Sequence, residues 1–196
     1  MTLRSGTRSG TVCATIAWVK TADGLYFRRE DYAPFWVRVL VDVIDILTFA
    51  ALCSALMITV LVIAPFNRMT LNLILLMFVA LAFLYFVIVK RSRFRTLGYR
   101  VGRVRIVALN GQTPGYTALT LRMMFGMLGP LNWLLDLIWL SNDTNRQALR
   151  DKFANTYVVK AKAQSAGNGR IVFRHYDILC YNCLFREVDA KPERDI

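Results

Sequence analysis

Three charged residues, Arg38, Asp42 and Asp45, lie at the start of a long apolar stretch. Their spacing of four and then three residues places them on one face of a helix, within about 10 Å along its axis. An ionised carboxylate deep in a bilayer costs about 2.5 to 3.5 kcal/mol on insertion scales, so these acids are candidates for binding a cation or a proton. A second interpretation stays open, in which Asp45 lies at the membrane surface and the acids neutralise Arg38 or a basic neighbour.

Other charged residues could join this group. Arg122 and Asp136 lie in a later apolar stretch, and Asp151 precedes a strand-like run. A structural salt bridge between Asp45 and Arg122 is an alternative to ion binding, and we expect a structural role for Asp136. Asp151 and its neighbour Lys152 are expected to tie the strands to the membrane helices.

A zinc site is the weakest of the chemical alternatives. His175, Cys180 and Cys183 have the local spacing of half such a site, but a second cysteine pair and a fourth ligand are missing. We therefore predict no metal site and no cofactor. Because the chain has one histidine, no nucleophile and base can be paired, and we expect no catalytic residues and no enzyme activity.

Two apolar stretches, residues 39–64 and 71–89, must position these groups. At about 1.5 Å per helical residue, each can cross a hydrocarbon core about 30 Å thick. A soluble domain in a chain of 196 residues would rarely bury two such helices. The sequence therefore predicts an α-helical integral membrane protein with two transmembrane helices, over about residues 37–64 and 71–89.

A third apolar stretch, residues 118–140, has two interpretations. Gly129-Pro130 is expected to break it into two half-helices that form a re-entrant or interfacial hairpin. The alternative is a third span. Residues 103–109 and 156–160 alternate like strands, and their pairing would bring both ends of the stretch to one side of the membrane, so we favour the hairpin.

The remaining chain is predicted to form a small cytoplasmic β-sheet and two terminal segments. Residues 1–32 are expected to form a β-hairpin arm, and residues 33–160 the membrane domain. Residues 161–196 are expected to form an aromatic and charged cytoplasmic tail.

Two glycine-containing segments are not expected to be strands. Asp23-Gly24 is predicted to be the turn of the arm, between strands over residues 11–20 and 25–29. Residues 164–169 have the composition of a flexible linker.

Positive charge predicts the orientation. The chain carries 25 Lys and Arg against 13 Asp and Glu. Residues 90–117 contain several of these cations and no acid, whereas the connection over residues 65–70 carries Arg68 alone. By the positive-inside rule, the N-terminus and the basic loop are cytoplasmic, in an inner (plasma) membrane protein. Topology and attraction to anionic lipid headgroups explain the cations, so we expect the lipid bilayer as a partner and no nucleic acid.

Several short motifs also follow one another at a distinctive spacing. They are residues 34–38 with Asp45, residues 96–100 with Gly102, residues 104–111, Leu121-Arg122, and residues 146–152 running on to 156–159. Over about residues 33–160 the chain resembles the RDD family of membrane proteins.

The resemblance assigns the Arg and Asp residues that name the family to Arg38, Asp45 and Asp151. Two positions depart from the family pattern. Asp42 adds an acid between the usual pair, and Arg150 stands where many members have a histidine.

The resemblance implies an association with transport, including cation/proton exchange in some members, and two functions stay open. The first is a component of ion or small-solute transport, acting as a homo-oligomer or in a membrane complex because two spans enclose no pathway. The second is a non-catalytic anchor or accessory protein that docks a partner through its cytoplasmic sheet and tail. Asp45 discriminates between them: a water-connected position between helices favours transport, and a position at headgroup level favours an anchor.

Overall fold

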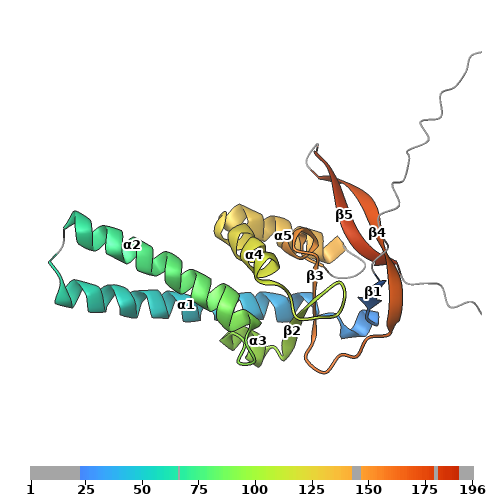
Figure 1. Cartoon of the computed structure of the whole chain (residues 1–196), viewed down its shortest axis with the longest axis horizontal. Coiled ribbons are helices and arrows are strands. Elements are labelled where there is room, and N and C mark those ends of the chain that lie inside the picture. Colours follow the sequence, from blue (N-terminus) through green and yellow to red (C-terminus); the bar gives the residue numbers. More distant parts are fainter. Residues whose placement is uncertain (1–22, 66, 143–146, 179–180, 190–196) are drawn as a thin grey trace, which may run out of the picture.

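Two long antiparallel helices project from a body of shorter helices and strands in the computed structural model (Figure 1). The structure describes residues 23–65, 67–142, 147–178 and 181–189. The N-terminal end of the first long helix is embedded in the body, and its other end is remote from the strands (Figure 1).

The first long helix is α1 (Phe35–Ile63), which follows the N-cap residue Pro34. The second is α2 (Arg68–Phe83), which continues as the π-helical segment η2 (Leu84–Val89). Proline suits a helix start because the first turn needs no backbone donor from it. Asn67 caps α2 by accepting a hydrogen bond of 2.8 Å from the Thr70 backbone N–H.

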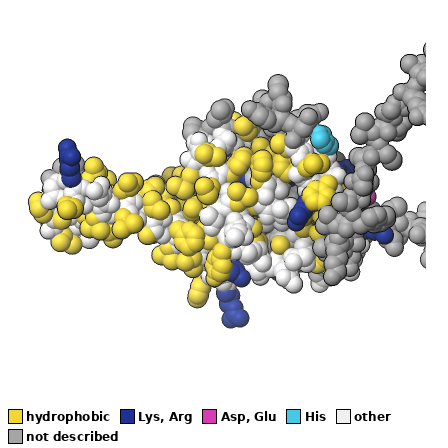
Figure 2. Space-filling view, turned by 45° about the horizontal axis from the view of Figure 1, so that its top comes forward, with side chains coloured by type: hydrophobic (Ala, Val, Ile, Leu, Met, Phe, Trp, Pro, Cys, Tyr) yellow, Lys and Arg dark blue, Asp and Glu magenta, His cyan; other side chains and the backbone are white. Residues whose placement is uncertain are grey.

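The projecting helices expose apolar side chains over much of their length (Figure 2). Near the loop between them, Val62 is 80% exposed and Met69 is 81% exposed. With 29 and 22 residues, Phe35–Ile63 and Arg68–Val89 are long and apolar enough to cross a membrane. Helices of this kind satisfy their own backbone hydrogen bonds and suit hydrocarbon better than water. The two predicted apolar helices are present.

The third apolar stretch forms two separate helices, α4 (Tyr116–Met127) and α5 (Pro130–Asn142). Gly129 lies between them with φ = 113°, a conformation that L side chains rarely adopt. At 12 and 13 residues, each helix measures about 18 to 20 Å and is shorter than the hydrocarbon core. The predicted break is therefore observed where glycine and proline meet.

Two antiparallel strands connect the ends of this helical pair. β2 (Val104–Ala108) follows the short helix α3 (Leu97–Val101), and β3 (Thr156–Lys160) follows the short helix α6 (Leu149–Phe153). Val104 pairs with Lys160, and Ala108 pairs with Thr156. The chain thus enters α4 from one strand of a sheet and leaves α5 for the other.

A second sheet contains β1 (Asp23–Tyr26), β4 (Gly167–Ile178) and β5 (Tyr181–Asp189) in the order β1-β4-β5. The predicted turn at Asp23-Gly24 is wrong, because both residues lie in β1 and pair with β4. A Cβ on Gly24 would lie 2.4 Å from the Val188 side chain, so glycine serves close packing here. The partner strand predicted over residues 11–20 lies outside the described residues.

The predicted linker is also wrong in its second half. Gly167, Asn168 and Gly169 belong to β4 and pair with Tyr26, Leu25 and Gly24. A Cβ on Gly169 would lie 2.3 Å from the backbone oxygen of Asp189, so this glycine permits close strand packing. The N-terminal arm and the C-terminal tail, predicted as separate segments, therefore share one sheet.

Two apolar clusters join these layers. One packs residues of the two sheets together: Phe27, Tyr32, Val107, Leu109, Tyr157, Val159, Ala163 and Val188. The other joins α1, α3 and the β2-β3 sheet through Ala33, Val41, Tyr99, Val104 and Val158. The first turns of α1 are thereby fixed to the strands, which positions the charged residues of that helix.

Candidate functional site

A buried charge network lies where α1, α4 and α6 meet the strands. Its centre is Asp151 on α6, which is fully buried. The Asp151 carboxylate accepts a hydrogen bond of 2.5 Å from Arg38 of α1 and another from Arg122 of α4. It also accepts one of 3.3 Å from the Ala148 backbone N–H at the start of its own helix. One carboxylate therefore joins three helices.

Both arginines reach further acceptors. Arg38 donates from Nε to the Ala33 oxygen at 3.3 Å and from Nη2 to the Val158 oxygen at 3.4 Å. Arg122 donates to the Thr156 hydroxyl at 2.7 Å. Because Val158 and Thr156 belong to β3, the two guanidinium groups connect α1 and α4 to the sheet.

The surroundings of Asp151 favour its ionised form. Burial alone would raise its pKa, but Arg122 and Arg38 outweigh this effect and lower the pKa to about 2. The carboxylate is therefore charged at any physiological pH. A paired charge of this kind holds structure and does not exchange protons near neutrality.

Arg150 organises a second part of the network. It pairs with Asp42 of α1, and its Nε lies 3.0 Å from an Asp136 carboxylate oxygen on α5. The Arg150 backbone N–H also donates to Asp136 at 2.9 Å. Arg150 thus holds α5 and α6 against α1.

Asp45 forms the third part and is 1% exposed. Its carboxylate accepts hydrogen bonds from the Gly98 backbone N–H at 2.8 Å, the Thr96 hydroxyl at 2.7 Å and the Tyr85 hydroxyl at 3.2 Å. The Lys90 ammonium lies 3.8 Å away. Asp45 therefore fastens α1 to η2 and to the start of α3.

Gly98 allows this close approach. A Cβ at this position would lie 2.3 Å from the Val41 backbone oxygen and 2.7 Å from an Asp45 carboxylate oxygen. No side chain larger than hydrogen fits without separating α3 from α1. The site therefore requires a glycine at position 98 as well as the carboxylate of Asp45.

Of the two pairings left open for the acids of α1, the structure shows the one with other basic residues and not the one with Arg38. Arg38, Asp42 and Asp45 do not pair with one another; each takes a partner from another part of the chain. The suggested bridge between Asp45 and Arg122 is also wrong, since Arg122 pairs with Asp151. Side chains on one helical face lie near one another, but here the charged partner of each comes from another element of the fold.

Sequence reasoning missed several members of the site. Arg150 was noticed as a departure from the family pattern and not as a site residue, although its place beside Asp151 was a usable signal. Tyr85 carries no signal in the sequence, because it acts as a neutral hydrogen-bond donor. Thr96 and Gly98 lie in the motif over residues 96–100, but their residue types do not reveal that they donate to Asp45.

The network contains equal numbers of negatively and positively charged side chains. Its four carboxylates are those of Asp42, Asp45, Asp136 and Asp151, and its four cations are those of Arg38, Lys90, Arg122 and Arg150. Burying unpaired charges would be costly, so this matching explains how the charges can lie among apolar helices.

A cavity of about 190 Å³ adjoins the network between α1, η2 and α4. Its charged wall is formed by Asp42, Asp45, Lys90, Arg122 and Arg150. The rest of its lining is apolar and includes Phe49, Phe86, Leu119, Met123 and Met127. The cavity has room for a small molecule that is apolar at one end and polar at the other.

A second polar connection reaches the outer sheet. Lys152 of α6, itself buried, pairs with Glu187 of β5 and donates to the Tyr176 hydroxyl of β4 at 3.1 Å. Trp139 of α5 packs against Tyr176 and Phe185. Adjacent residues of α6 therefore face two layers: Asp151 contacts helices, and Lys152 contacts the β4-β5 hairpin.

The structure does not bring the weak metal candidates together. In the register of β4 and β5, His175 is opposite Leu184 and Cys183 is opposite Tyr176. His175 and Cys183 therefore point to opposite faces of the hairpin, because side chains alternate along a strand. Cys180 lies outside the described residues. Among the residues that are described, no group of three His, Cys, Asp or Glu side chains could hold a metal ion.

Comparison with known proteins gives one family. The sequence model of the RDD family matches residues 32–155, which include every member of the charge network. No curated protein and no solved structure gives a significant match.

Proposed function

The chain belongs to the RDD family, and from this premise we propose that it is a multi-pass inner-membrane protein acting as a non-catalytic anchor or assembly component. The proposal rests on one observation: each carboxylate of the buried network already has its cations and donors. Such a network can fix the membrane helices relative to a layer of strands, and this layer can be contacted by a partner.

The contacts of Asp45 bear most directly on the choice between an anchor and a transporter. A carboxylate offers about four hydrogen-bond positions, and Asp45 uses three of them for neutral donors, with Lys90 nearby. A cation entering this site would have to displace donors that fix η2 and α3. This set of donors favours a structural carboxylate over an exchange site, whereas the position of Asp45 between helices, on the wall of the 190 Å³ cavity, is the one expected for transport.

We further propose that the strands and both ends of the α4–α5 pair lie on the cytoplasmic side. The pairing of β2 with β3 supports this arrangement because it returns the chain to one sheet. The basic composition of residues 90–105 supports the cytoplasmic orientation. Reporter fusions at Asn110 and after Ile196 should both be cytoplasmic, and an external reporter after Ile196 would overturn the topology.

Transport of a small solute is the second candidate function, and the 190 Å³ cavity is the observation that favours it. Its charged wall and apolar lining suit an amphipathic molecule. Because two long helices enclose no pathway, this function would need several copies or another membrane protein.

The variant Asp45→Asn separates the two functions. In an anchor, the substitution weakens the contacts to Thr96 and Gly98 and lowers the melting temperature in detergent, while vesicles containing either protein show no gradient-driven flux. In a transporter, wild-type vesicles show flux and Asp45→Asn abolishes it with membrane insertion intact. Asp189→Asn is the control, because Asp189 is exposed and lies outside the network.

A further inference from the structure

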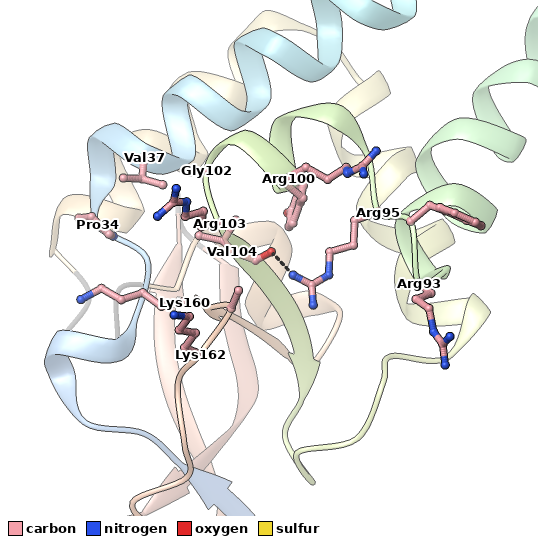
Figure 3. A pocket seen from close by; sticks show the side chains of 13 residues that line it. Pro34, Val37, Arg93, Arg95, Arg100, Gly102, Arg103, Val104, Lys160 and Lys162 are labelled. Carbon is pink, nitrogen blue, oxygen red and sulfur yellow. Dashed lines mark hydrogen bonds between the residues drawn. The ribbon is translucent and has the colours of Figure 1, made fainter.

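A basic cavity of about 920 Å³ lies beneath the start of α1, beside α3 and the ends of β2 and β3 (Figure 3). Its lining carries six cations: Arg93, Arg95, Arg100, Arg103, Lys160 and Lys162. Among the described residues, none of those that line it is acidic. It is separate from the 190 Å³ cavity, with which it shares no lining residue.

These cations differ from those of the buried network in how they are paired. Within the part of the chain that the structure describes, none of the six forms an ion pair. Arg95 is held by a neutral contact and donates to the Val104 oxygen at 3.3 Å (Figure 3). The concentration of unmatched positive charge gives the cavity an attraction for anions.

The backbone fixes two of these arginines in place. Arg95 has φ = 54° and Arg103 has φ = 51°, conformations that residues with a Cβ rarely adopt. The Arg103 oxygen accepts a hydrogen bond of 2.7 Å from the Ala161 N–H, and the Arg95 N–H donates to Ser92 at 3.2 Å. Arginine occupies two positions where glycine or asparagine would be less strained, which points to a use for the charged side chains.

Exposed apolar side chains on the segments that contribute to the cavity indicate the kind of anion. Phe94 lines the cavity and is 73% exposed, and Trp36 on the first turn of α1 is 77% exposed. Leu97 and Val101 of α3 are also exposed. Arg93 follows Val89, the last residue of the second long helix, by four positions. Cations next to exposed aromatic and aliphatic side chains at the end of a membrane helix match the boundary between headgroups and acyl chains.

We propose that this cavity binds the phosphate of an anionic phospholipid in the leaflet that faces the strands. The cations contact the headgroup phosphate, and Phe94 and Trp36 lie against the upper part of the acyl chains. The site extends beyond the anchoring function proposed above, because it would give the anchor a preference for anionic lipid. Guanidinium groups suit the role, since they bind phosphate oxygens in pairs.

The test uses the full chain purified in a non-ionic detergent, with bound dioleoyl phosphatidylglycerol measured by native mass spectrometry. The variant Arg100→Gln/Arg103→Asn removes two of the cavity cations, and asparagine tolerates the backbone conformation at position 103. The matched control, Arg29→Gln/Arg170→Gln, removes two exposed cations that do not line the cavity.

We expect the cavity variant to lower the affinity for phosphatidylglycerol by about tenfold or more, and the control to change it by less than about twofold. Neither variant should lower the melting temperature, and phosphatidylcholine should not be retained. Equal losses in the cavity and control variants would overturn the proposal, since attraction would then follow net charge alone. Displacement of the lipid by an equal concentration of inorganic phosphate would also overturn it, because the site would then recognise a soluble anion.

Discussion

Two charged regions of the molecule meet at Tyr99 and differ in how their charges are matched. On one side, the Tyr99 hydroxyl lies 3.5 Å from Arg122, within the network whose cations all face carboxylates. On the other, Tyr99 lines the basic cavity, whose cations face none among the described residues. The matched charges are mostly buried and connect elements remote in sequence. The unmatched charges are mostly exposed and form no ion pair with another described residue, so they can bind an external anion.

The comparison predicts the largest effect for Asp151→Asn. This change leaves Arg38 and Arg122 buried without their shared carboxylate, and we expect it to lower the stability by about 3 to 5 kcal/mol. Unfolding in detergent, followed by intrinsic fluorescence, measures the loss. Asp189→Asn should change stability by less than about 0.5 kcal/mol because Asp189 is exposed. Comparable losses in the two variants would remove the distinction between matched and exposed charges.

Lowering the pH should reproduce part of the loss of stability expected for Asp151→Asn. The pKa of Asp151 is lowered to about 2 in the fold, against about 3.9 in an unfolded chain. A lowered pKa stabilises the fold above the unfolded value, and this stabilisation is lost as the pH falls towards the folded value. The difference in melting temperature between the wild type and Asp151→Asn should therefore be constant from pH 7 to about pH 5 and narrow between about pH 4 and pH 2. If the two melting temperatures become equal above pH 5, Asp151 is not held ionised by its arginines.

A smaller effect is expected from Gly98→Ala. The added Cβ would press on the Val41 oxygen and the Asp45 carboxylate, moving α3 away from α1 at a cost of about 1 to 3 kcal/mol. Gly115→Ala is the matched control, because its Cβ would meet no atom closer than 3.7 Å, the Thr117 hydroxyl. Equal melting temperatures for the two variants would contradict the close approach of α3 to Asp45.

The sequence was most informative where structure is local. Apolar runs predicted α1 and the α2–η2 helix, and the dipeptide Gly129-Pro130 predicted the break between α4 and α5. Alternation predicted β2 and β3. Each of these depends on neighbouring residues, whose types set the helical or extended conformation directly.

The charge pairings could not be predicted in the same way. Arg38 and Asp151 are separated by 113 positions, and Asp42 and Arg150 by 108. Residue types identified both acids and Arg38 as candidates, but the fold decides which cation reaches which carboxylate. The glycines of β1 and β4 were misread for a related reason, since their close packing against β5 becomes visible only when distant strands are brought together.

The most direct test of the structural role of the network is a double-mutant cycle between Arg38 and Asp151. Unfolding free energies are measured for the wild type, Arg38→Gln, Asp151→Asn and the double variant. Because the two side chains share a buried hydrogen bond of 2.5 Å, we predict a coupling energy of about 1 to 3 kcal/mol, with the double variant more stable than the sum of the single losses implies. If the losses of the two single variants add up to the loss of the double variant within about 0.3 kcal/mol, the two residues act independently. That result would contradict a direct connection between α1 and α6 through this ion pair.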